Sequence, residues 1–400
     1  MVGPGDWRAV RRFWRSQLAP GAAAVLPSPK RALDLHLDPP LLTGGTANLT
    51  LASSRARRLS GRLTLEAPEG VAVEPAEVPV DALTAGLPVE ASLRVTWPTL
   101  GPAAIEATAR ASLGWVERAF PIALVRAGDP GMKVRVAEMA RDGQRVVTVE
   151  NGFLRFSVGP DHGGSLFELT DGGASHLLTS FPTPEPHLEM NPWFGGATPQ
   201  VWLSPSYWQP SWMAARSYRW SEASRELLGH TWSGVRLSAE LDREHNRGLD
   251  VEVEYLTLGG SNLVALVARL DTHGAPLRGV PGFFCFPAPE GSTKGTIGHY
   301  RRNGLHSRRQ VGGLEARAEG WCALESEATG RCLVAFTPDP WTALTLDHDE
   351  EYLRFHLQGT PESALDAEAS GKPVEVIAYL AIARSIEEAR VYRLLGAERP

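Results

Sequence analysis

The segment 187–232 is the part of the chain whose residue types best suit ligand binding. It contains six of the twelve tryptophans, interleaved with glutamine, serine, tyrosine and arginine. Indole rings stack on the C–H faces of sugars, and planar polar groups bind sugar hydroxyls. Four prolines between positions 192 and 210 argue against one long core strand. The segment is therefore either a carbohydrate-binding surface or aromatic packing between two sheets. The predicted substrate-binding residues in it are Asn191, Trp193, Gln200, Trp202, Trp208 and Trp212.

Several acids and histidines could supply acid–base chemistry. In a strand over 187–191, alternation places the side chains of His187, Glu189 and Asn191 on one face. Such a face could orient a sugar or move a proton, although an exposed edge strand explains it equally simply. Metal ligation is less well supported, because no third ligand occurs at a known spacing. The predicted catalytic residues are His187, Glu189, His230, Glu254 and His299, with solvent exposure as the alternative for Glu254.

A basic loop over 299–309 stands out in an acidic chain. Arginine forks bind carboxylates and sulfates, so Arg301 and Arg302 are predicted to contact an anionic sugar, with a solvated loop as the alternative. The acidic run 347–351 could hold a cation or form a charged turn. The chain has no phosphate-binding glycine loop, nucleophile elbow or metalloprotease helix, and we predict no cofactor and no metal.

Composition limits the classes of partner. The formal net charge of −6, from 40 basic and 46 acidic residues, argues against a nucleic-acid partner. Three cysteines without metal-site spacing are expected to be free thiols. No run approaches the ~20 apolar residues of a membrane span, and no signal peptide is visible at the N-terminus. These features predict a cytoplasmic protein, or an exported one if the chain is a piece of a longer protein. The oligomeric state is not predicted.

Apolar alternation predicts an all-β protein of two domains. Residues 1–31 form a lead-in with a basic amphipathic helix over 6–18, which either docks on the protein or contacts a membrane surface or partner. Residues 32–125 show short strands between turns, typical of a small sandwich. Residues 126–144 are predicted to link it to residues 145–400, where strands are longer. That region includes a hairpin at Asn151-Gly152, a doubly buried strand over 263–270 and a short C-terminal helix capped by Ser385.

Two resemblances support this division. Residues 65–73 (LEAPEGVAV), Pro75 and residues 80–86 (VDALTAG) resemble the immunoglobulin-like domain attached to many bacterial glycosidases, which implies a packing role. Residues 150–160 (ENGFLRFSVGP), 163–166 (GGSL), 169–171 (LTD) and 255–264 (YLTLGGSNLV) resemble a galactose-mutarotase-like β-sandwich. The second resemblance covers roughly residues 146–395 and implies a large antiparallel β-sandwich that faces carbohydrate. The histidine and glutamate motifs of that family's epimerases have no counterpart here.

These patterns favour a carbohydrate-binding or carbohydrate-processing protein, with glycan recognition by the second domain. One alternative is a sugar-active enzyme, an epimerase, lyase or hydrolase, that uses a His/Glu acid–base pair. Another is a non-catalytic structural protein whose aromatic side chains form core and interdomain contacts.

Overall fold

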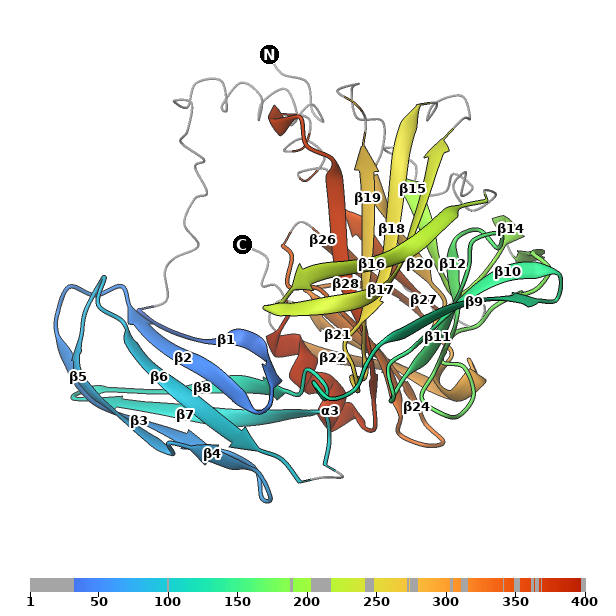
Figure 1. Ribbon diagram of the computed structural model, residues 1–400. Helices are drawn as coiled ribbons and strands as arrows, with labels where there is room; N and C mark the ends of the chain where they lie inside the picture. Colours follow the sequence, from blue (N-terminus) through green and yellow to red (C-terminus); the bar gives the residue numbers. More distant parts are fainter. Residues whose placement is uncertain are drawn as a thin grey trace, which may run out of the picture.

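The computed structural model describes residues 32–98, 101–187, 190–202, 217–241, 248–271, 273, 280–302, 305–310, 316–340, 342–348, 353–360, 363, 367 and 369–396. The first part of the chain, blue to cyan in Figure 1, forms a small sandwich of two four-stranded antiparallel sheets around one apolar core. One sheet has the order β1 (Leu33–Thr43), β2 (Thr46–Ser53), β6 (Val89–Thr96), β4 (Ala72–Glu74). The other has the order β5 (Glu77–Leu83), β3 (Leu59–Glu66), β7 (Ala104–Leu113), β8 (Val116–Val125).

The rest of the chain forms a larger sandwich of two nine-stranded antiparallel sheets, which we name by a central strand of each. The β20 sheet has the order β23 (Ala316–Ala318), β26 (Thr342–His348), β27 (Leu353–Gly359), β20 (Val280–Cys285), β15 (Ala197–Trp202), β12 (Ser165–Thr170), β11 (Arg155–Gly159), β10 (Gln144–Glu150), β9 (Arg135–Arg141). The β19 sheet has the order β16 (Arg219–Leu227), β17 (His230–Leu241), β18 (Leu249–Thr257), β19 (Leu263–Asp271), β28 (Val374–Ala383), β25 (Cys332–Phe336), β24 (Trp321–Ser326), β21 (Thr296–Arg302), β22 (Leu305–Gln310). A separate hairpin joins β13 (Glu185–His187) to β14 (Met190–Trp193).

Strand β19 is buried on both faces because each face packs against a different layer. Val264 and Leu266 point into the core between the two nine-stranded sheets. Leu263 and Val267 belong to a second cluster that includes the C-terminal helix α3 (Ile386–Val391) and the inner edge of the small sandwich. The apolar run at 263–270, which only Arg269 interrupts, follows from this double burial. A short 3-10 helix, η3 (Tyr392–Leu394), continues α3.

Polar contacts join the two sandwiches around α3. Ser385 caps the helix by accepting a hydrogen bond from the Glu388 amide at 3.3 Å. The Glu388 side chain accepts hydrogen bonds from the amides of Ala103, at 2.7 Å, and Arg384, at 2.9 Å. Arg393 forms an ion pair with Glu106 of β7 at 2.9 Å. The helix therefore connects the last strand of the chain to the small sandwich.

The sequence-based prediction of an all-β fold built from two antiparallel sandwiches is confirmed. The doubly buried strand, the capped C-terminal helix and the β10–β11 hairpin are also observed. The hairpin, however, uses a four-residue loop between Glu150 and Arg155, in which Gly152 has positive φ and the Asn151 side chain accepts from the Leu154 amide. The dipeptide Asn151-Gly152 is typical of a two-residue type I′ turn, and that interpretation of the sequence is wrong here.

The remaining fold predictions concern the linker, the N-terminal helix, the domain boundaries and the cysteines. The segment predicted to link the domains contains strand β9, which pairs with β10 along its whole length. The predicted helix at 6–18 lies outside the described residues, and the domain boundaries and the immunoglobulin-like kinship remain predictions. The three cysteines are free and buried. In the described part of the chain, no helix has the length and apolar character needed to cross a membrane.

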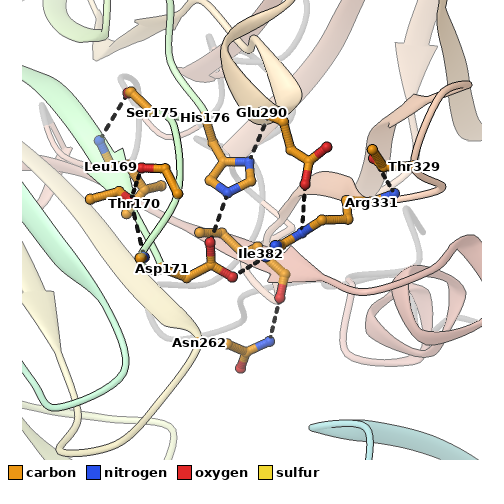
Figure 2. Close-up of polar contacts among 12 residues, drawn as sticks. Leu169, Thr170, Asp171, Ser175, His176, Asn262, Glu290, Thr329, Arg331 and Ile382 are labelled. Atoms are coloured by element: carbon orange, nitrogen blue, oxygen red, sulfur yellow. Dashed lines mark hydrogen bonds and ion pairs between the residues drawn. The ribbon is translucent and has the colours of Figure 1, made fainter.

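An ion-pair network ties the two nine-stranded sheets together at one end (Figure 2). Asp171, just after β12, binds His176 Nε2 at 3.2 Å and also contacts the Arg331 guanidinium beside β25. Arg331 Nε lies 3.5 Å from Glu290, which belongs to the 3-10 helix η2 (Pro289–Gly291). Burial acts to raise the pKa of Asp171, but the hydrogen bond from His176 and the charge of Arg331 outweigh it and lower the pKa to about 2.

Replacing Asp171 with Asn should lower the free energy of unfolding in a pH-dependent way. A carboxyl whose pKa is depressed by folding adds stability that is fully present above its unfolded pKa and lost as the pH falls through its folded pKa. Folding lowers the pKa of Asp171 from 3.8 to about 2, which corresponds to roughly 2 kcal/mol of free energy of unfolding. Denaturant unfolding at pH 7 should show this deficit, and the two proteins should converge towards pH 2.

The matched control is Asp161→Asn. Asp161 also has a pKa of about 2, set by its hydrogen bond to Arg145, but 31% of its side chain is exposed, against 7% for Asp171. Solvent screening makes such surface pairs contribute little, so this variant should lose less stability. An Asp171→Asn deficit that is the same at every pH would contradict the assigned role of the carboxylate.

Candidate functional site

The outward face of the β20 sheet carries a buried row of polar and aromatic side chains. Residues at alternate positions of β26, β27, β20 and β15 fill the core between the sheets, including Leu346, Leu357, Phe283 and Val201. The intervening residues must therefore point to the opposite face. On that face the buried side chains are Thr198, Gln200, Phe284, Thr345, Arg354 and His356. Polar groups are costly to bury, so their concentration on the non-core face of a sheet indicates a site.

A pair of glutamine amides flanks a glycine at the centre of this face. Gln200 of β15 lies opposite Gly282 of β20, and Gly282 lies opposite Gln358 of β27. Two strand spacings separate the glutamines by about 10 Å, and glycine places no side chain between them. The Oε1 atom of Gln358 is buried and has no hydrogen-bond partner in the described part of the chain. The same is true of Trp193 Nε1. A ligand that supplied hydroxyl groups here would satisfy such atoms.

The next row of the same face holds charged side chains around an aromatic ring. Phe284 lies opposite both Thr198 and His356. The His356 ring packs edge-on against Phe284 with centroids 4.6 Å apart, and the Arg354 guanidinium lies 5.6 Å from the same ring. Asp347 of β26 binds His356 Nε2 at 3.1 Å and Arg354 at 2.9 Å. Figure 1 shows β20 and β27 side by side in the interior of the sheet.

Neighbouring basic groups keep the Asp347 carboxylate ionised. Burial acts to raise the pKa of Asp347, but the hydrogen bond and charge of His356, together with Arg354, hold the pKa below its ordinary value. The Arg354 side chain is only 2% exposed. Arg354 can bind oxygen atoms of a ligand. The neighbouring imidazole of His356 can exchange a proton with it.

An aromatic cluster borders the row. Trp193, Phe284 and Phe286 pack together, and the His187 ring lies 4.5 Å from the indole of Trp193. Trp193 is 7% exposed, so in this structure its ring fills space between neighbours and leaves no open face for stacking. The chain reverses between His187 and Met190, which face each other across the β13–β14 hairpin. The expected single strand over 187–191 is therefore wrong, although His187 does approach the site through Trp193.

A buried tyrosine fixes strand β15 to the opposite sheet. The Tyr255 hydroxyl of β18 lies 3.0 Å from the Ala197 carbonyl, at the start of β15, and 2.8 Å from the Gly164 carbonyl. Because the hydroxyl is wholly buried, these carbonyls replace the water it would lose. The contact crosses the core and sets the position from which Gln200 projects.

Several predicted site residues lie elsewhere. Glu254 is buried, but its carboxylate binds Arg236 at 2.6 Å and Arg225 at 3.3 Å on the β19 sheet. Its burial contradicts the solvent exposure considered for Glu254, and the base role stays a prediction. His230 Nε2 lies 2.8 Å from the Leu41 carbonyl of the small sandwich. His299, on β21, binds Glu325 and His306.

Some of the remaining predicted site residues lie outside the described part of the chain, and the others can be placed in strands. Glu189, Trp208 and Trp212 lie outside the described residues. Asn191 lies in β14, and Trp202 lies in β15 opposite Val280. Arg301 is half-buried in β21, and the exposed Arg302 is the last residue of that strand. The structure thus brings His187 to Trp193, which packs against Phe284 on the face that also carries Gln200. The β19 sheet contains the other five predicted residues, His230, Glu254, His299, Arg301 and Arg302.

Sequence reasoning missed Arg354, His356 and Gln358. The signal was present in the alternation of residues 353–358, where apolar positions take turns with arginine, histidine and glutamine. Alternation predicts that one face of the strand is apolar and buried and that the other is polar. It does not show whether the polar face forms a site or is exposed to solvent. In the described part of the chain, no group of three or more His, Cys, Asp or Glu side chains is placed to hold a metal ion.

A scan against models of protein families finds no match, and a search of the curated proteins finds none. Among solved structures, the chain is similar to a putative aldose 1-epimerase from Klebsiella pneumoniae, at 10% identity and a TM-score of 0.43, covering 74% of this chain and 91% of that one. A galactose mutarotase-like protein from Clostridium acetobutylicum has 10% identity and a TM-score of 0.40, covering 63% and 98%. The GH36 α-galactosidase AgaB from Geobacillus stearothermophilus has 12% identity and a TM-score of 0.41, covering 65% and 43%. At these TM-scores the likenesses carry no argument about ligand or activity, and the all-β architecture is defined by the strand order itself.

Replacing Trp193 with Ala should destabilise the protein. Because the indole is buried among Phe284 and Phe286, its removal leaves a large cavity, and such changes cost roughly 3–5 kcal/mol. Thermal and denaturant melts measure the loss. The control is Trp115→Ala in the small sandwich, whose side chain is 62% exposed and should tolerate truncation. Wild-type stability in Trp193→Ala would show that the ring does not act in packing.

Proposed function

We propose that the large sandwich binds a carbohydrate on the outward face of its β20 sheet. The observation that carries the proposal is the pair of amides from Gln200 and Gln358 on either side of Gly282. A pyranose ring lying over the glycine would place hydroxyl groups within reach of both amides. Amides suit hydroxyls because each offers a donor and an acceptor in one plane.

The neighbouring groups support the same ligand class. Arg354 and Asp347 supply charged hydrogen-bond partners, and charged groups bind hydroxyls more strongly than neutral ones. The unsatisfied Oε1 of Gln358 provides an acceptor that a ligand hydroxyl would fill.

Replacing Gln200 or Gln358 with Ala should weaken sugar binding and leave folding intact. A lost neutral hydrogen bond costs about 1 kcal/mol, or roughly fivefold in Kd, and the double variant should lose roughly 25-fold. Saturation-transfer NMR over a panel of monosaccharides identifies a ligand, and calorimetry then measures Kd. Asn48→Ala, which removes an exposed amide from the small sandwich, is the matched control. Unchanged affinity in the double variant, or binding of no sugar by the native protein, would count against the proposal.

The contact between Asp347 and His356 favours a second candidate function, acid–base catalysis on a bound sugar. The imidazole could take a proton from a sugar hydroxyl, and the carboxylate would stabilise the imidazolium that forms. His356→Gln should then abolish proton-dependent turnover, such as anomer exchange followed by NMR, while Kd changes by only a few fold. Equal exchange rates with the variant and the native protein would leave binding as the sole function proposed.

A further inference from the structure

Three loops form the end of the small sandwich that lies away from the larger one, and we name this end the outer tip. The loops join β2 to β3 (residues 54–58), β5 to β6 (residues 84–88) and β7 to β8 (residues 114 and 115). The larger sandwich contacts the other end of the same strands, at Ala103 and Glu106. Strand β7 has 10 residues and spans about 30 Å between the two ends. In Figure 1 the outer tip points to the left, away from α3.

Arg55 holds the three loops of the outer tip together. Its carbonyl accepts a hydrogen bond from the Ala85 amide at 2.7 Å, which ties the first loop to the second. Its guanidinium lies over the indole of Trp115 in the third loop, 5.3 Å from the ring centre. The guanidinium of Arg57 lies 5.9 Å from the same ring. The outer tip is therefore one connected surface.

The loops of the outer tip carry positive charge. Arg55, Arg57 and Arg58 are exposed, and no ion pair joins any of them to an acid in the described part of the chain. Arg58 donates only to a backbone carbonyl, that of Asp81, at 3.2 Å, so its charge is not neutralised. The three loops contain no acidic residue. The first acids on the adjoining strands, each at least one residue behind the loops, are Asp34, Asp81, Glu90 and Glu117.

Two large apolar side chains project from the same loops. Trp115 is 62% exposed and Leu87 is 63% exposed. Each follows a glycine with positive φ, Gly86 or Gly114, where an added Cβ would have no atom within 4 Å. These turns therefore stand clear of the rest of the protein and present both side chains outwards. Tryptophan favours the boundary between water and lipid, and leucine favours the hydrocarbon interior.

The chain that precedes β1 brings more positive charge to this end. Leu33, the first residue of β1, pairs with Ser53, which directly precedes the first loop of the outer tip. Residues 1–31 are thus attached beside the loops, and their sequence contains six basic residues and one acid. Their sequence also predicts a basic amphipathic helix over 6–18, for which contact with a membrane surface is one of the interpretations.

We propose that the outer tip docks the protein on an anionic lipid surface. The three guanidinium groups lie at the level of the headgroup phosphates and carboxylates, and Trp115 and Leu87 enter the boundary between headgroups and acyl chains. Leu87 favours this partner over a soluble polyanion, because an aliphatic side chain gains free energy by leaving water and not by meeting phosphate or sulfate. The docking surface is separate from the β20 face and does not depend on the sugar site.

Co-sedimentation of the full chain with phosphatidylcholine vesicles, prepared with and without phosphatidylserine, tests the charged part of the surface. The native protein should bind more tightly to the vesicles that contain phosphatidylserine, and salt should weaken this binding. Arg55→Gln combined with Arg57→Gln should weaken it roughly 25-fold, because each arginine near an anionic surface contributes about fivefold. The matched control, Arg94→Gln combined with Arg135→Gln, removes the same charge from exposed positions away from the outer tip and should bind like the native protein.

Leu87→Ser and Trp115→Ala test the apolar part. Both side chains are largely exposed, so the variants should fold, as a thermal melt will show. Each should weaken vesicle binding several-fold, by the same factor at low and high salt, because insertion of an apolar side chain does not depend on charge.

Three outcomes would overturn the proposal. The first is that the native protein binds neither kind of vesicle. The second is equal vesicle binding by the native protein and all the tip variants, which would place the lipid contact elsewhere, for example in residues 1–31. The third is binding of the native protein to heparin but not to vesicles, which would identify the partner as a soluble polyanion.

Discussion

The double burial of strand β19 is the constraint on which the rest of the structure depends. One face of its sheet packs against the β20 sheet, and the other packs against α3 and the edge of the small sandwich. Both faces are therefore used for packing over the central strands. The β20 sheet has only one face in that core, so its outward face can carry polar side chains. The division of labour between the sheets follows: one joins the domains, and the other presents Gln200, Gln358 and His356.

The same constraint explains why charged groups on the two sheets behave differently. On the β19 sheet, Glu254 is buried but lies between Arg236 and Arg225, and Arg225 also binds Glu375 at 2.6 Å. These ion pairs give the buried carboxylate of Glu254 charged partners inside the protein. On the β20 sheet, the amides of Gln200 and Gln358 keep hydrogen-bonding capacity. Buried polar side chains therefore belong to a packing element on the β19 sheet and to a candidate site on the β20 sheet. Only their hydrogen-bond partners distinguish the two cases.

Much of the fold could be predicted from the sequence because strand periodicity is a local signal. The alternation in β1, β18 and β27, and the continuous run in β19, each predict burial directly. The site could be predicted only in part. The tryptophan-rich segment led to Trp193 and Gln200, but the partners of Gln200 come from β20 and β27, at least 80 residues later in the chain. Which strands become neighbours is decided by the closure of the whole sheet, and alternation within one strand carries no information about it. For the same reason, the sequence could not show that Glu254 meets two arginines.

The packing of α3 shapes a cavity between the two sandwiches that Arg301, His306 and Arg393 help to line. The Glu388 side chain accepts hydrogen bonds from the amides of both Ala103 and Arg384, so the helix cannot move relative to the small sandwich without breaking one of them. That fixes η3, and with it Arg393, opposite β21. Arg301 can then reach the Arg393 carbonyl, and β22 places His306 beside them. A buried carboxylate that satisfies backbone amides at a domain boundary thus helps to place η3, whose Arg393 carbonyl accepts a hydrogen bond from Arg301 and whose Arg393 guanidinium pairs with Glu106. The cavity is a consequence of how the sandwiches are joined, whereas the β20 face is a property of one sheet alone.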